Sequence, residues 1–170
     1  MIIEIYRDNN QQINNFASNY LKKNQRGVAI ALDIGLKRIG LASCDQDRII
    51  CTPRGIINRF SNNKDLEAID NYLKLYQASF IVVGIPLSNN LEDNENSLFI
   101  KNFVGKIDCF FENKILIFLV NEAFSSFEAR KIIKNNQYIN NKKARKIKKH
   151  YDDIAATVIL QDFIQIIKNY

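Results

Sequence analysis

Three acidic residues that are far apart in the sequence stand where carboxylates could meet in space: Asp33, Glu122 and Asp152. Asp33 ends the apolar run 28–32, and a carboxylate inside such a strand is costly unless a positive charge meets it. Glu122 comes just after the apolar run 115–120. Because ligands of α/β sheets sit at the carboxyl ends of the strands, both acids are candidates for one shared site.

The third acid belongs to the last predicted helix, 151–168. Apolar residues at helical spacing mark the inward face of this helix: Ala156, Leu160, Phe163 and Ile167. Asp152 lies four residues before Ala156 and so falls on that face, at the first turn. Asp153 is rotated by about 100° from it. The helical period therefore favours Asp152 over Asp153 as the inward acid.

A trio of converging carboxylates needs a cation. Two bare carboxylates about 4 Å apart repel by about 4 kcal/mol at an effective dielectric constant of 20, so they bind cations or take up protons. Oxygen ligands without histidine or thiolate select Mg²⁺ or Mn²⁺, and such ions can support phosphodiester hydrolysis. Taken singly, Asp33 could be a turn acid, and Glu122 and Asp152 could be helix-entry acids. The prediction depends on the three together.

A dense basic segment, 142–149, precedes Asp152, and we call it the basic arm. Its charged residues are Lys142, Lys143, Arg145, Lys146, Lys148 and Lys149. They are candidate phosphate contacts, although a charge run can also be a solvated face. Lys37 and Arg38, next to Asp33, could likewise hold a phosphate or pair with surface acids. The net charge of +6 indicates a polyanionic partner, most simply nucleic acid.

The order of apolar patterns predicts an α/β fold. Strands are expected at 28–33, 39–44, 49–57 (interrupted near Pro53), 80–84 and 115–120, and helices at 66–76, 99–110, from Ser125, and 151–168. The first three strands form an antiparallel meander, and helical crossovers make the later strands parallel. We expect a mixed five-stranded sheet with helices on both faces. Residues 27–170 form the single predicted domain, and residues 1–26 an N-terminal extension with a possible short helix.

The composition narrows the classes of function. The single histidine, His150, excludes a multi-histidine zinc site within the chain. Three cysteines, Cys44, Cys51 and Cys109, show neither a disulfide framework nor metal-site spacing, which indicates reduced thiols and a cytoplasmic location. The chain has no apolar run of about 18 residues and no signal-peptide pattern at its start, so we expect no membrane association.

Four motifs, in order, resemble those of the YqgF family, whose members are described as Holliday-junction resolvases and as pre-16S rRNA nucleases. The matching segments are 33–42, 83–87, 121–126 and 152–156, and the basic arm falls where that family has one. The resemblance covers residues 28 to 168. Two positions depart from the third motif: Asn121 stands where the family has Asp, and Ala123 where it has Arg.

The resemblance implies a ribonuclease-H-like fold and a metal-dependent nuclease, with metal-binding roles for Asp33, Glu122 and Asp152. We expect an endonuclease that hydrolyses phosphodiester bonds in the 5′-end processing of 16S rRNA precursors. The alternatives are a Holliday-junction resolvase acting on branched DNA and a nucleic-acid-binding module that does not cleave. The chain could act as a monomer or a homodimer. An actin-like or sugar-kinase-like ATPase would need a second lobe, for which 170 residues leave no room.

Overall fold

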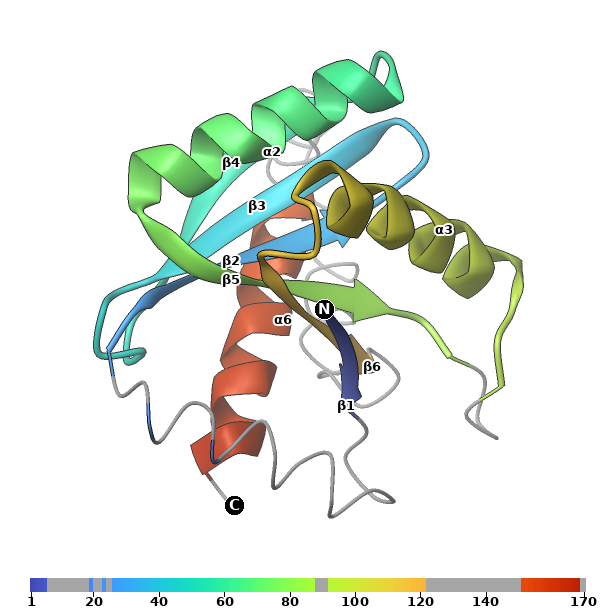
Figure 1. Cartoon of the computed structure of the whole chain (residues 1–170). Coiled ribbons are helices and arrows are strands. Elements are labelled where there is room, and N and C mark those ends of the chain that lie inside the picture. Colours follow the sequence, from blue (N-terminus) through green and yellow to red (C-terminus); the bar gives the residue numbers. More distant parts are fainter. Residues whose placement is uncertain (6–18, 20–22, 24–25, 88–91, 122–150, 169–170) are drawn as a thin grey trace, which may run out of the picture.

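The computed structural model describes residues 1–5, 19, 23, 26–87, 92–121 and 151–168. The strands form one six-stranded sheet in the order β1-β6-β5-β2-β3-β4 (Figure 1). Their bounds are β1 Ile2–Ile5, β2 Val28–Ile34, β3 Arg38–Cys44, β4 Cys51–Asn58, β5 Ala78–Ile85 and β6 Leu116–Asn121. The antiparallel pairs are β2–β3 and β3–β4, whereas β1, β6, β5 and β2 run parallel. The predicted meander and the parallel strands that follow it are confirmed.

The sheet has one strand more than the five expected. Strand β1 pairs with β6 at the sheet edge, with Ile2 beside Ile117, and the Met1 ammonium binds the Asp108 carboxylate at 2.7 Å. These residues had been assigned to the N-terminal extension. The assignment was wrong for Ile2–Ile5 because four residues carry too short a pattern, and because their pairing partner β6 is far from them in the sequence. The helix considered within residues 1–26 falls outside the described residues.

The interruption expected near Pro53 is absent, since β4 runs continuously through this residue. Proline cannot donate a hydrogen bond within a sheet and is tolerated mainly on edge strands and at irregularities. Strand β4 provides both conditions: it is the outer strand of the sheet, and its register against β3 shifts between Leu41 and Ala42, the residue paired with Pro53.

The helices lie on both faces of the sheet, as predicted (Figure 1). Helices α2 and α3 cover one face, and α6 crosses the other. Their bounds are α2 Asn62–Tyr76, α3 Glu95–Phe110 and α6 Tyr151–Lys168. Ser61 caps α2 by accepting a hydrogen bond from the Lys64 amide. Among the described residues, no helix is both long enough and apolar enough to cross a lipid bilayer.

The alternation of β2 divides the interior into two cores. Ile30, Leu32 and Ile34 belong to the core beneath α2 and α3. Ala29 and Ala31 belong to the core beneath α6. The next position on that second face is Asp33, so the fold directs this acid toward the side of the sheet that α6 covers.

Candidate active site

The first turn of α6 rests directly on β3 at Gly40. A Cβ atom at this position would lie 1.8 Å from the carbonyl oxygen of Asp152 and 2.9 Å from the amide nitrogen of Asp153. Only glycine permits such an approach, because a residue with a side chain would force the backbone to move. Gly40 is also the residue that pairs with Asp33 across β2 and β3. The structure therefore brings Asp33 and the acidic start of α6 together around one glycine.

Asp153 is the more deeply buried of the two helix acids. Its exposed fraction is 5%, whereas the side chain of Asp152 is 24% exposed. The expectation that Asp152 points further inward is thus wrong with respect to burial. The two side chains are about 100° apart around the helix axis, and they flank the line on which the backbone touches Gly40. Helical periodicity assumes that the surface packed against the helix is uniform, so it does not predict the contact with Gly40.

Asp152 already faces a cation. The Arg38 Nε atom lies 2.8 Å from Asp152 Oδ2, and this buried oxygen accepts no hydrogen bond. Arg38 belongs to the same face of β3 as Gly40, two residues away. Asp152 Oδ2 is thus paired by charge alone, and Asp33 of β2 lies on the same side of the sheet. Carboxylate oxygens of this kind are the ligands that suit Mg²⁺ or Mn²⁺. Asp33 and Asp152 are therefore suited to hold such an ion.

Arg59 fixes the turn that connects β2 with β3. Its Nη1 atom donates to the Gly35 carbonyl at 3.1 Å, and its amide donates to the Lys37 carbonyl at 2.9 Å. The guanidinium also pairs with the buried Asp65 at 2.8 Å and lies 4.3 Å from the centre of the Phe103 ring. Lys37 is consequently exposed on a turn whose backbone is held in place by Arg59. No local sequence signal indicated Arg59, because its partners come from three separate elements.

The other predicted site residues lie outside the described residues. These are Glu122 and the basic arm, comprising Lys142, Lys143, Arg145, Lys146, Lys148 and Lys149. Within the part of the chain that is described, no three histidine, cysteine or acidic side chains form a metal-sized group. Strand β6 ends at Asn121, immediately before Glu122, and Asn121 pairs with Ile85 of β5.

Asn121 lies on the opposite side of the sheet from Asp33. Ile117 and Leu119 belong to the core beneath α2 and α3, whereas Phe118 and Val120 belong to the core beneath α6. Asn121 continues the first series. Asparagine at this position therefore removes no carboxylate from the face that carries Asp33.

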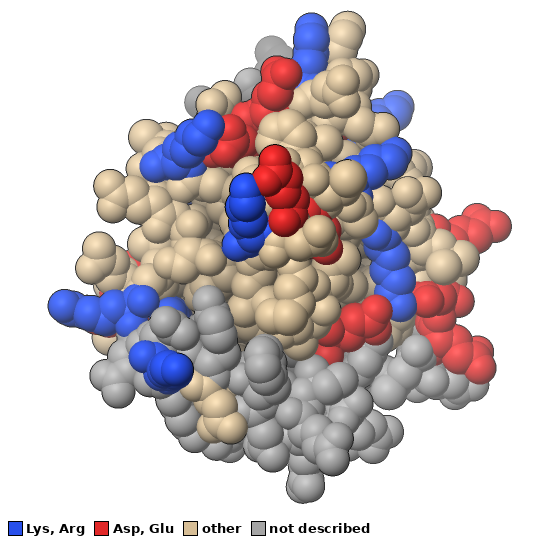
Figure 2. Space-filling model, viewed as in Figure 1, with Lys and Arg blue, Asp and Glu red and all other residues tan. Residues whose placement is uncertain are grey.

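Charge on the described surface is mixed on the side of α2 and α3. Figure 2 shows basic and acidic side chains interspersed among uncharged ones on this face. A polyanion gains most where positive charges gather without acids among them. In this view, therefore, the described surface of α2 and α3 shows no broad patch of positive charge alone.

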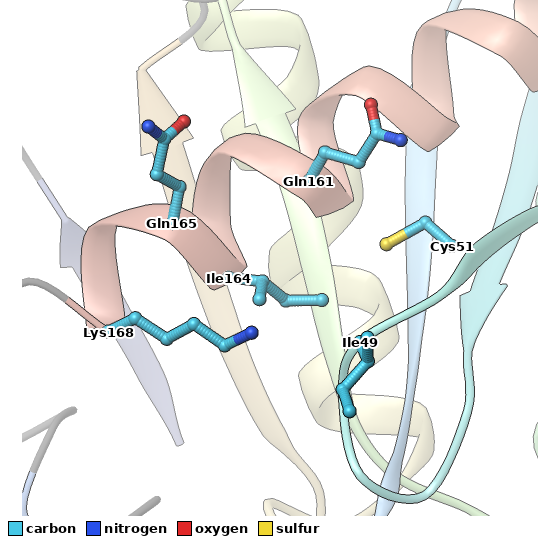
Figure 3. A pocket seen from close by; sticks show the side chains of 6 residues that line it. All are labelled: Ile49, Cys51, Gln161, Ile164, Gln165 and Lys168. Atoms are coloured by element: carbon cyan, nitrogen blue, oxygen red, sulfur yellow. The ribbon is translucent and has the colours of Figure 1, made fainter.

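A pocket of about 260 Å³ lies at the other end of α6. It is lined by Ile49, Cys51, Gln161, Ile164, Gln165 and Lys168 (Figure 3). Gln161 is nine residues beyond Asp152, which corresponds to about 13 Å along the helix axis. The pocket is separate from the acids and carries no carboxylate among its lining residues.

The three cysteines are free thiols, and two of them should react slowly with alkylating agents. Burial raises the pKa of Cys44, and burial together with the adjacent Cys44 raises the pKa of Cys51 to about 12. Since the thiolate is the reactive form, a pKa of about 12 leaves roughly one thiolate in 10⁴ for Cys51 at pH 8.

Iodoacetamide at pH 8, read out by peptide mass spectrometry, should therefore modify the exposed Cys109 first. Cys44 and Cys51 should react only after denaturant is added. Equal rates at all three thiols in the folded protein would contradict the burial described here.

The chain is similar to proteins that are named as nucleases and resolvases. The protein-family model described as "RuvX: Holliday junction resolvase" matches residues 27–166 of this chain. A protein of Sulfurihydrogenibium sp. is 35% identical over 135 residues, covering 79% of this chain and 88% of the relative. One of Campylobacter lari is 35% identical over 134 residues, covering 79% and 94%. Both relatives carry the name "Putative pre-16S rRNA nuclease".

Among solved structures, RuvC of T. thermophilus in complex with a Holliday-junction substrate has a TM-score of 0.51 with this chain. The sequences are 10% identical, and the match covers 81% of this chain and 93% of RuvC. At this identity the likeness concerns the fold alone. The fold is ribonuclease-H-like, as expected from the sequence.

Proposed function

Because the chain belongs to the RuvX family, also called YqgF, we propose that it is a divalent-metal-dependent endonuclease that hydrolyses phosphodiester bonds in nucleic acid. The observation that carries the proposal is the contact at Gly40, which joins the first turn of α6 to the strand position beside Asp33. Two acids that are more than a hundred residues apart in the sequence thereby share one side of the sheet.

In this proposal Asp33, Glu122 and Asp152 hold Mg²⁺ or Mn²⁺. Glu122 is included because it follows β6 directly in the sequence, and the parallel strands β2, β5 and β6 direct their carboxyl ends to the same edge of the sheet. The bound ion would supply positive charge at the scissile phosphate. Asp153, buried beside Asp152, would help to fix the first turn of α6.

Arg38 has a second role in this mechanism. Its guanidinium now neutralises Asp152 at 2.8 Å. A metal ion held by Asp152 would supply the positive charge that Arg38 supplies in this structure. Arg38 would then be able to bind a phosphate oxygen of the substrate, as Lys37 would from the neighbouring turn position. The basic arm, 142–149, would hold phosphates further from the scissile bond.

Arg38→Ala should therefore weaken substrate binding without unfolding the protein. One lost phosphate contact lowers the slope of log affinity against log salt by about 1, while loss of a partly exposed ion pair changes the stability by less than about 1 kcal/mol. Fluorescence anisotropy with a labelled oligonucleotide in Ca²⁺, at several salt concentrations, measures the slope. Arg26→Ala is the matched control, since Arg26 pairs with the exposed Asp47. An unchanged slope for Arg38→Ala would remove this residue from the phosphate contacts.

The substrate we propose is a 16S rRNA precursor, cleaved near its 5′ end in the cytoplasm. The names of the two curated relatives described above support this choice. The second candidate is branched DNA, which the description of the family and the substrate in the RuvC complex support. Phosphate contacts alone do not distinguish RNA from DNA, so both substrates are compared in the cleavage assay.

A metal-titrated cleavage assay tests the proposal. A precursor rRNA fragment and a four-way DNA junction are each incubated with the wild-type protein in EDTA, Mg²⁺ and Mn²⁺. We expect cleavage of the RNA at a defined position, only with metal. Cleavage of the junction instead would select the resolvase function. Intact substrates, together with binding that is equal in EDTA and Mg²⁺, would show a module that binds without cleaving.

A further inference from the structure

The most exposed large apolar side chain among the described residues is Phe60, at 80%. It lies between the end of β4 and Ser61, the residue that caps α2. Leu36, in the turn between β2 and β3, is 73% exposed. Two large apolar groups are therefore presented to solvent close to the turn that follows Asp33.

The two side chains belong to neighbouring backbone segments. Strands β3 and β4 pair Arg38 with Asn58, and the hydrogen bond from the Arg59 amide to the Lys37 carbonyl extends that register beyond the strand ends. Leu36 is the turn residue next to Lys37, and Phe60 follows Arg59 directly, so both belong to this end of the sheet. Figure 1 shows the β2–β3 turn and the start of α2 at the same end of the sheet.

Positive charge surrounds this pair. The Lys64 Nζ atom lies 4.4 Å from the centre of the Phe60 ring, and the exposed Lys37 follows Leu36 directly. We call Leu36, Lys37, Phe60 and Lys64 the turn platform. One ammonium group over an exposed ring, with a second lysine on the neighbouring turn, favours an anionic partner that also has a flat apolar surface.

The backbone beneath the platform is held in place. The Phe60 amide donates to Asp65 Oδ1 at 3.1 Å, and Asp65 is itself buried against the Arg59 guanidinium at 2.8 Å. Because this backbone is already ordered, little conformational entropy remains to be lost when a ligand contacts the ring. The platform is also linked to the acids, since Arg38 continues the chain from Lys37 to its ion pair with Asp152.

We propose that the turn platform stacks an unpaired nucleobase of the substrate on Phe60, with Lys37 and Lys64 on the flanking phosphates. Aromatic rings combined with basic groups are the usual means of binding single-stranded nucleic acid, and they tolerate any base. The inference rests on the proposed nuclease function and adds to it the place where a single strand leaves the cleavage site. RNA and DNA offer the same base faces, so both are tested.

Tryptophan substitution gives a direct measure of stacking, because the chain contains no tryptophan. Phe60→Trp places a single indole on the platform. We expect its fluorescence to be quenched when a 12-residue single-stranded RNA or DNA is added in EDTA. The matched control is Leu75→Trp, since Leu75 is also exposed but lies in the last turn of α2; its fluorescence should stay unchanged.

The variant Phe60→Ala measures how much the aromatic ring contributes to the affinity for the oligonucleotide. Loss of one base–aromatic stack weakens binding by about tenfold, and Phe60→Tyr should restore it, with the melting temperature unchanged in both variants. Unquenched Phe60→Trp in a protein that still binds the oligonucleotide would overturn the platform and leave the nuclease function intact. If the wild-type protein fails to bind or cleave any nucleic acid, both the platform and the nuclease function are wrong.

Discussion

Asp33→Asn is expected to lower the rate of cleavage by about 10³-fold, while the affinity for nucleic acid stays within about twofold. Asp33 lies on the face of β2 that α6 covers, beside Gly40 and the first turn of α6. Asparagine keeps the size of the side chain but removes the negative charge, so the site loses a metal ligand without a change in packing. Cleavage and binding of the same labelled substrate are measured side by side.

The matched control for this variant is Asp47→Asn. Asp47 is also an aspartate near the strands, but it is exposed and pairs with Arg26 at the opposite end of β2. Removal of an exposed ion pair should alter neither cleavage nor stability noticeably. Full cleavage by Asp33→Asn would exclude Asp33 from the mechanism. Equal loss in both variants would indicate a general effect of charge.

Gly40→Ala is expected to lower the free energy of unfolding by at least about 2 kcal/mol and the rate of cleavage by about 10²-fold. The added Cβ atom would lie 1.8 Å from the Asp152 carbonyl oxygen, so the start of α6 must move away from β3. Because Asp152 and Asp153 are carried by that turn, the movement displaces them from Asp33. Chemical denaturation and single-turnover cleavage measure the two effects.

Gly105→Ala is the control, since a Cβ atom at that position in α3 meets nothing within 4 Å. Alanine is the better helix former, so this variant should be more stable than wild type by about 0.5–1 kcal/mol and fully active. A Gly40→Ala protein with wild-type stability and activity would contradict the contact between β3 and α6 on which the site depends.

The sequence predicted the central part of the fold well because its signals there are local. The apolar run before Asp33, the wholly apolar strand β5 and the periodic helix α6 each carry their own pattern. The N-terminal strand β1 was missed because its hydrogen bonds come from β6. Pro53 suggested an interruption because the sequence does not reveal that β4 is the outer strand.

The candidate site was predictable in its residue types and less so in its contacts. Asp33 and the acids of α6 do lie on one side of the sheet, as their positions in the pattern indicated. The sequence left Arg38 as either a phosphate contact or a partner of surface acids, and it assigned Asp152 to a metal ion, so it did not identify the ion pair between the two. Gly40 could have been recognised: a glycine inside a strand is a known sign of close backbone approach.

Anomalous scattering from a crystal grown with Mn²⁺ tests the central claim most directly. The account predicts a strong peak within coordination distance of the carboxylates of Asp33, Glu122 and Asp152, with the Arg38 guanidinium moved away from Asp152. A map in which these three carboxylates point apart and no manganese lies between them would contradict it.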